Sequence, residues 1–215
     1  MMFNNEKELV EKLVLDLQQL YDTQFIVREL RSGNNIADVV YTTELRRDEI
    51  LFSDYQLAYY YVREIYNKKN VDLRRVNISD IGTKRKFDKF LLELESQGYI
   101  QIEGSTIKSI KKVNGATKKF IAVEAKLSDW RSGIEQAIRY KSYADEVYLA
   151  LSAEYIKNVD ISFLENHGIG LMSVSDKKLK LTLRAKRNTH FDLDIQLYLS
   201  DKFLNELKMK EIQLF

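Results

Sequence analysis

Residues 120–127 of the chain read FIAVEAKL. This run of apolar residues is typical of a buried strand. Side chains alternate between the two faces of a strand, so Glu124 and Lys126 share one face. A carboxylate and an ammonium group are costly to bury unless a partner compensates them. A metal ion bound by the carboxylate is one such partner, and a solvated Glu–Lys pair on a sheet face is the commoner alternative.

The segments that follow this strand alternate between helix and strand. The pattern predicts a helix at 131–144, a strand at 145–152, a helix near 158–166, and strands at 168–175 and 178–185. A final helix is expected at 199–209. Alternation of this kind is typical of an α/β protein, so we expect that fold class.

The N-terminal segment predicts a helix followed by a β-hairpin. Residues 5–22 carry leucines at helical spacing, and two strand-like runs at 25–30 and 35–42 flank the turn SGNN. Asp38 is the single acidic residue in the second run, NIADVVYT. It is therefore a second carboxylate placed within an apolar strand.

The middle of the chain changes character. Residues 53–67 predict a tyrosine-rich helix, and a short helix-like piece then precedes a turn at Gly82. A longer helix follows at 84–96, with Gly98 placed as its C-terminal cap. Residues 99–112 alternate apolar and polar residues around a glycine turn, which indicates a hairpin. This order resembles the winged helix-turn-helix family, with the long helix as the recognition helix and the hairpin as the wing.

Basic charge is concentrated in the same region. The whole chain has 34 Lys and Arg against 32 Asp and Glu, a net charge of +2. Residues 68–119 hold 13 of the basic and 6 of the acidic residues, a balance of +7, which leaves −5 for the remainder. Such asymmetry favours a polyanion partner for the basic segment. A solvated lysine-rich surface is an equally weighted alternative.

Composition excludes several kinds of site. The chain has no Cys, which rules out a disulfide scaffold, a thiolate zinc site and a cysteine nucleophile. Its two histidines, His167 and His190, are too few for a histidine-built metal cluster. A metal would therefore be held by oxygen ligands, which suits Mg²⁺ or Mn²⁺.

The sequence also bears on location. No apolar run approaches the roughly 18 residues of a membrane helix. The N-terminus carries acidic residues where a signal peptide would be basic. We therefore expect a cytoplasmic protein with no membrane partner.

Taken in order, these motifs resemble the PD-(D/E)XK nuclease superfamily. An N-terminal helix comes first, and a hairpin that ends in Asp38 follows it. The strand with Glu124 and Lys126 comes next, and the helix after it carries Gln136 and Tyr140 at positions i and i+4. The order and the structural context of the motifs carry the resemblance, because each motif is weak by itself.

The resemblance implies a restriction-endonuclease-like mixed sheet flanked by helices, with an inserted winged-helix module. Residues 1–43 and 117–215 would form a discontinuous nuclease-like domain, and residues 44–116 would form the insertion. Two features depart from the family pattern. The residue before the aspartate is Ala37 where the family often has proline. The two acids are also farther apart in sequence than usual, which the insertion explains.

The resemblance further implies roles for individual residues. Asp38 and Glu124, with the backbone carbonyl of Ala125, would bind one or two Mg²⁺ or Mn²⁺ ions. The metal would lower the pKa of a bound water and stabilise charge on the phosphate. Lys126 would orient the attacking water. The residues that would position the metal shell or the nucleic-acid backbone are Gln136 and Tyr140. Further, less specific candidates for a metal-binding acid are Glu8, Glu11 and Glu29.

The resemblance thus implies a metal-dependent nuclease, and with the basic segment we expect it to act on DNA. The residues expected to contact nucleic acid are Lys84, Arg85, Lys86 and Lys89 on the recognition helix and Lys108, Lys111 and Lys112 on the wing. Three alternatives stay open: a DNA-binding regulator without chemistry, an RNA-directed nuclease, and a winged helix that binds protein. A homodimer also stays open.

Overall fold

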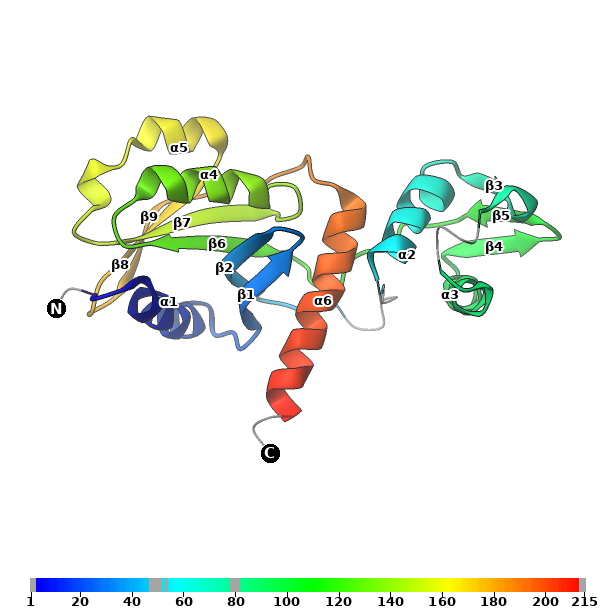
Figure 1. The fold of residues 1–215 in the computed structure, drawn as a ribbon, viewed down its shortest axis with the longest axis horizontal. Helices are drawn as coiled ribbons and strands as arrows, with labels where there is room; N and C mark the ends of the chain where they lie inside the picture. Colours follow the sequence, from blue (N-terminus) through cyan, green and yellow to red (C-terminus); the bar gives the residue numbers. More distant parts are fainter. Residues whose placement is uncertain (1–2, 47–51, 53, 78–81, 213–215) are drawn as a thin grey trace. The chain divides into compact units, whose positions relative to one another are not determined.

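The computed structural model describes residues 3–46, 52, 54–77 and 82–212, and the chain divides into two compact units (Figure 1). The first unit comprises Met1–Leu45, Thr117–Phe191 and Phe203–Phe215. The second comprises Arg46–Ala116 and Asp192–Lys202. The sequence placed the whole C-terminal segment in the first domain, and the structure differs in grouping residues 192–202 with the inserted segment.

The first unit is built on a six-stranded mixed sheet. Its strand order is β1-β2-β6-β7-β8-β9. The strands are β1 (Ile26–Ser32), β2 (Asn35–Tyr41), β6 (Ile121–Lys126), β7 (Glu146–Ser152), β8 (Gly170–Val174) and β9 (Leu179–Leu183). The central strands β6, β7 and β8 are parallel, and the pairs at both edges are antiparallel. The mixed α/β class expected from the alternating pattern is confirmed.

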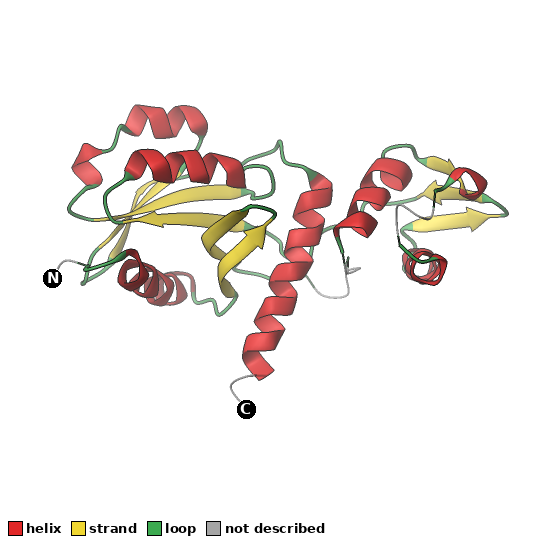
Figure 2. Cartoon of the chain, viewed as in Figure 1, coloured by secondary structure: helices red, strands yellow, loops and turns green. Residues whose placement is uncertain are grey.

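Helices cover both faces of this sheet (Figures 1 and 2). The α-helices that cover the two faces are α1 (Glu6–Tyr21), α4 (Trp130–Tyr140) and α5 (Ile161–His167). Leu9, Leu13 and Leu17 of α1 are fully buried against the sheet face that carries Val123 and Ala125. Helices α4 and α5 lie on the opposite face, which is the face of Glu124. The alternation of side chains along β6 therefore directs its polar residues toward α4.

The second unit packs helices against a three-stranded antiparallel sheet of order β3-β5-β4. Its elements are α2 (Tyr55–Tyr60), the π-helix η1 (Tyr61–Tyr66), β3 (Asn70–Asp72), the 3₁₀-helix η2 (Leu73–Arg75), α3 (Lys84–Ser96), β4 (Ile100–Glu103) and β5 (Thr106–Ser109). Its buried core is aromatic, and Phe52 contacts both Tyr61 and Phe90 at 5.6 Å between ring centroids.

Several local predictions for this region are confirmed, and others differ. Helix α3 covers the predicted residues 84–96, and the predicted hairpin appears as β4 and β5. Gly98 follows α3 with a φ of 70°, as a C-terminal cap requires. Strand β3 was not predicted, because three residues carry too little periodicity. The helix-like piece expected before Gly82 falls largely on residues 78–81, which lie outside the described residues.

The C-terminal helix α6 (Leu193–Ile212) begins earlier than the predicted 199–209. Leu197 is fully buried in the core of the second unit, and Phe203 is fully buried against Phe120 of the first. In the part of the chain that the structure describes, no helix combines the length and apolarity needed to cross a membrane.

Candidate active site

The candidate site begins where strands β2 and β6 separate. Their antiparallel ladder pairs Val39 with Val123, and continuing the register would place Asp38 opposite Glu124. At that point the backbone N–H of Ala125 donates to Oδ2 of Asp38 at 2.8 Å. The aspartate side chain thus takes the place of a backbone acceptor. The prediction that residues 38–41 and 121–125 lie in neighbouring strands is confirmed.

Glu124 is buried at the centre of the arrangement, with only 1% of its surface exposed. Its Oε1 forms an ion pair with Nζ of Lys126 at 2.8 Å. The Tyr140 hydroxyl contacts its Oε2 and also lies 2.6 Å from the carbonyl oxygen of Ile36. A phenol has one proton and can donate to only one of these acceptors. The hydroxyl proton is therefore shared between the Glu124 carboxylate and the Ile36 carbonyl oxygen, which compete for it.

The electrostatics of the site agree with this geometry. Burial raises the pKa of Glu124, and the negative charge of Asp38 raises it further. Burial also raises the pKa of Asp38, against the lowering effect of the Ala125 N–H. Burial lowers the pKa of Lys126, but contact with Glu124 and the nearby carboxylates outweighs it, so the net shift is upward. Lys126 therefore stays charged at neutral pH, while two carboxylates compete for its single positive charge.

Helix α4 brings Tyr140 to the site through close packing on β6. Asp129 caps the helix by accepting the backbone N–H of Ser132 at 3.2 Å. A Cβ on Gly133 would lie 2.6 Å from Cδ1 of Leu149 and 3.0 Å from Cγ of Lys126. Glycine at this position lets the helix approach the strand closely. Gln136, which the family resemblance places beside Tyr140, instead donates to Oγ of Ser132 at 3.2 Å.

The acidic residues of the N-terminal segment are arranged differently from the sequence-based expectation. The carboxylate of Glu8 accepts the backbone N–H of Asn4 at 2.9 Å, which lowers its pKa, and Glu11 is exposed. Glu6, which the sequence analysis did not single out, lies 3.8 Å from Nζ of Lys126. Its place in the first turn of α1, directly after the cap Asn5, gave no signal that separated it from its neighbours.

Glu29 lies across the hairpin from Asp38. The register of β1 and β2 pairs Arg28 with Val39 and Leu30 with Ala37, which places Glu29 opposite Asp38. Glu29 is exposed and has a φ of 57°, a value that a non-glycine residue rarely adopts. Its charge contributes to the raised pKa of Asp38. It therefore influences the site through its field rather than through a contact.

The donor atoms at the site fit a hard divalent cation. Asp38 and Glu124 offer carboxylate oxygens. A strand residue directs its N–H and its C=O to the same side. Because the N–H of Ala125 points to Asp38, the carbonyl of Ala125 also faces the side on which Asp38 lies. Among the described residues, no three or more His, Cys, Asp or Glu side chains are grouped so that they could hold a metal ion. A cation here would complete its shell with backbone oxygen and water, as Mg²⁺ often does.

The basic residues of the second unit fall into two groups. Lys84, Arg85 and Lys89 on α3 are exposed, as is Lys112. The other three have partners within the unit: Lys86 is ion-paired with Asp54, Lys108 lies 2.6 Å from Glu103, and Lys111 lies 4.1 Å from the Tyr99 ring centroid. Of the two histidines, His167 stacks on Phe163 at the end of α5, and Nδ1 of His190 lies 3.0 Å from Oγ1 of Thr189.

The fold and the site together define an α/β protein in which two acids and a lysine lie where the interior strands β2 and β6 of a mixed sheet separate. No protein-family model matches the chain, and no curated protein matches its sequence. One solved structure with which it shares similarity is a protein of unknown function from Silicibacter pomeroyi, with a TM-score of 0.34 and 15% identity. The match covers 45% of this chain and 62% of that one, so the chain spans less than two thirds of that protein.

Proposed function

We propose that the protein is a metal-dependent nuclease of the PD-(D/E)XK type that hydrolyses phosphodiester bonds in DNA. The observation that carries the proposal is the meeting of Asp38, Glu124 and Lys126 at one strand edge. Buried Glu124 and half-buried Asp38 both have raised pKa values, and the single positive charge of Lys126 does not balance two carboxylates. A divalent cation supplies the missing positive charge, and oxygen ligands of this kind suit Mg²⁺ or Mn²⁺.

Each residue then has a defined task. Asp38, Glu124 and the carbonyl of Ala125 would hold the cation, which when bound activates water and stabilises negative charge on the phosphate. Lys126, kept protonated by its surroundings, orients the attacking water and offsets charge in the transition state. Tyr140 holds the Glu124 carboxylate in place through its hydroxyl.

The second unit supports a role in binding nucleic acid. We propose that it is a winged helix, and its strand order β3-β5-β4, with α3 directly before the β4–β5 hairpin, supports this. Lys84 and Arg85 occupy the first turn of α3, where the helix dipole disfavours positive charge. An anion bound at that end would offset the cost, and the DNA backbone is such an anion.

The experiment is cleavage of plasmid, single-stranded DNA and RNA by the purified protein with Mg²⁺, Mn²⁺ or EDTA. We predict metal-dependent cleavage of DNA that falls by about 10²–10³-fold in Glu124→Gln and Lys126→Met, each of which removes a charge at the reacting centre. Glu135→Gln, on the exposed face of α4, serves as the matched control. Full activity in both site variants, with the fold preserved by circular dichroism, would overturn the assignment.

One observation favours a second candidate, a DNA-binding regulator that performs no chemistry. Both oxygens of Glu124 already contact protein groups, Lys126 and Tyr140, as they would in a purely structural ion pair. This candidate predicts DNA binding that is unaffected by EDTA, with no cleavage under any metal condition. Cleavage confined to the RNA substrate would instead support the RNA-directed nuclease.

A further inference from the structure

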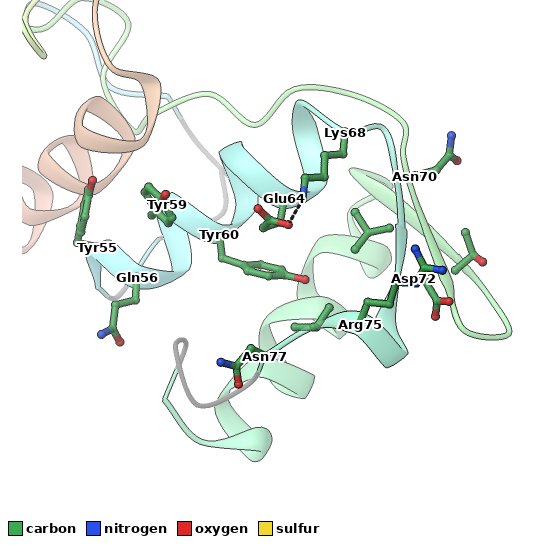
Figure 3. A pocket seen from close by; sticks show the side chains of 13 residues that line it. Tyr55, Gln56, Tyr59, Tyr60, Glu64, Lys68, Asn70, Asp72, Arg75 and Asn77 are labelled. Carbon is green, nitrogen blue, oxygen red and sulfur yellow. Dashed lines mark hydrogen bonds and ion pairs between the residues drawn. The ribbon is translucent and has the colours of Figure 1, made fainter.

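The second unit contains a hollow of about 860 Å³, well apart in sequence from the acids of the candidate active site. Helices α2 and η1 form one side of it, and β3 with η2 forms the other (Figure 3). We call it the tyrosine hollow, and its main lining residues are Tyr55, Tyr59, Tyr60, Lys68, Asn70 and Arg75. Its volume lies within the usual range of small-ligand sites, about 300–1,000 Å³.

Tyr60 is the residue that marks the hollow as a binding site. Its side chain extends from α2 with the hydroxyl directed away from the helix, toward the side lined by Asp72 and Arg75 (Figure 3). Only 7% of Tyr60 is exposed, and its hydroxyl has no hydrogen-bond partner among the described residues. Its ring packs edge-on against Phe87 at 5.1 Å between centroids. Burial raises its pKa, so the group stays a phenol that can donate. An unpaired buried hydroxyl is costly, and a ligand acceptor would remove that cost.

Charge in the tyrosine hollow is also unbalanced. Glu64 is paired with Lys68 at 2.5 Å, and Asp72 is held by Arg74 through two contacts of 2.8 and 2.9 Å. Arg75 is exposed and forms no ion pair within 4.0 Å in the part of the chain that the structure describes, although its charge helps to lower the pKa of Asp72. Each lining acid therefore has its own cationic partner, and the exposed guanidinium of Arg75 can contact a ligand.

Two further tyrosines line the hollow. Tyr55 and Tyr59 are 41% and 47% exposed, and their ring centroids lie 6.0 Å apart. Exposed tyrosine faces stack well on planar aromatic ligands, at about 1–3 kcal/mol per base for nucleobases. The side-chain amides of Gln56 and Asn70 add both donors and acceptors to the wall.

We infer that the tyrosine hollow binds an unstacked nucleobase, with ring faces for stacking, Tyr60 as a hydrogen-bond donor and Arg75 for the charge of the adjoining phosphate. The choice of a nucleobase over other planar ligands rests on the proposed nucleic-acid function of the chain. The base can come from a strand, as an extrahelical nucleotide, or from a free nucleotide. In the first case the second unit would direct the nuclease to DNA with an unpaired base.

The test uses the full chain in EDTA, so that binding is separate from cleavage. The probes are a duplex with one extrahelical 2-aminopurine, the same duplex with that base paired, and the free 2-aminopurine nucleotide. Fluorescence reports both affinity and the stacking state of the base. We expect preference for the extrahelical base, and a loss of affinity of about threefold to tenfold in Tyr60→Phe, the range for one hydrogen bond. Arg75→Ala should weaken the same complex.

Tyr66→Phe, which removes a hydroxyl from the same unit outside the hollow, is the matched control. Tyr60→Phe should not lower the unfolding temperature, because the lost hydroxyl has no hydrogen-bond partner among the described residues of the free protein. Binding of the free nucleotide alone, lost in Tyr60→Phe, would support the inference with a free nucleotide as the source. Equal binding of all probes by wild type, Tyr60→Phe and Arg75→Ala would overturn it. Metal-dependent cleavage of the paired duplex tests the proposed function separately.

Discussion

Burial disfavours the ionised forms of Asp38 and Glu124. The pKa of each carboxyl is raised, so the folded protein binds protons more tightly there than the unfolded chain does. The contribution of these two groups to stability is therefore present at low pH and is lost as pH rises through their raised pKa values. A cation that binds the two ionised carboxylates would cancel this loss at neutral and higher pH.

At the residue scale we therefore predict that Mg²⁺ raises the unfolding temperature of the wild type at pH 8 more than at pH 5. At about 100 times its Kd, a ligand of the folded state adds about 2.7 kcal/mol, which corresponds to several degrees. Asp38→Asn should lose the response to Mg²⁺ and, without metal, unfold at a higher temperature than the wild type at pH 8. Differential scanning calorimetry at the two pH values measures both effects, with Glu135→Gln as the control. A Mg²⁺ response that Asp38→Asn retains in full would place the metal elsewhere.

At the scale of elements, the approach of α4 to β6 depends on Gly133. An alanine there would bring its Cβ to 2.6 Å from Leu149 and 3.0 Å from Cγ of Lys126, so the helix or the side chains must shift. We predict that Gly133→Ala destabilises the protein by about 1–3 kcal/mol, as overpacking does. It should also reduce cleavage by more than the loss of folded protein explains, because Lys126 moves.

Denaturant unfolding together with kcat on a short DNA substrate checks this prediction. Glu135→Ala, on the exposed face of the same helix, controls for general effects of substitution in α4. A Gly133→Ala variant with native stability and native kcat would show that the helix–strand contact does not set the position of Lys126.

The first turn of α3 carries two kinds of basic residue: those free to contact DNA and one that is ion-paired within the protein. Lys84 and Arg85 are exposed, whereas Lys86 is paired with Asp54, which also caps α2 by accepting the N–H of Leu57 at 3.0 Å. We predict that Lys84→Ala with Arg85→Ala weakens DNA binding and lowers the log–log salt slope by about two units. Lys86→Ala should leave the slope unchanged and lower stability slightly. DNA affinity measured across a salt series decides, and equal slopes for all variants would remove α3 from the interface.

At the scale of the whole molecule, helix α6 contributes to both units. Leu197 is fully buried in the aromatic core of the second unit, and Asp201 accepts the backbone N–H of Phe52. We predict that Leu197→Ala costs about 2–5 kcal/mol, since it opens a cavity in a core built from a distant segment. Hydrogen exchange should accelerate at 54–77 and 82–113 and stay unchanged in β6 and β7. Asn205→Ala, exposed on the same helix, is the control, and uniform acceleration across both units would show that they unfold together.

Much of the fold was predictable because its signals are local. The apolar run of β6, the hairpin with Asp38 and the amphipathic helix α3 each follow from the spacing of neighbouring residues. Alternation along β6 also determined that Glu124 and Lys126 share a face. The adjacency of Asp38 and Glu124 came from the order of motifs, and the pairing of β2 with β6 confirms it.

The remaining features depend on residues that are distant in sequence, and periodicity carries no information about such partners. The sequence by itself determined the elements, their α/β alternation and the two acids and lysine placed in apolar strands. Folding alone brings Glu6 rather than Glu8 close to Lys126, pairs Asp54 with Lys86, and buries the Tyr60 hydroxyl without a hydrogen-bond partner among the described residues. The physical reason is that burial, ion pairing and pKa depend on the groups that folding brings together, whereas helix and strand formation depend on neighbours along the chain.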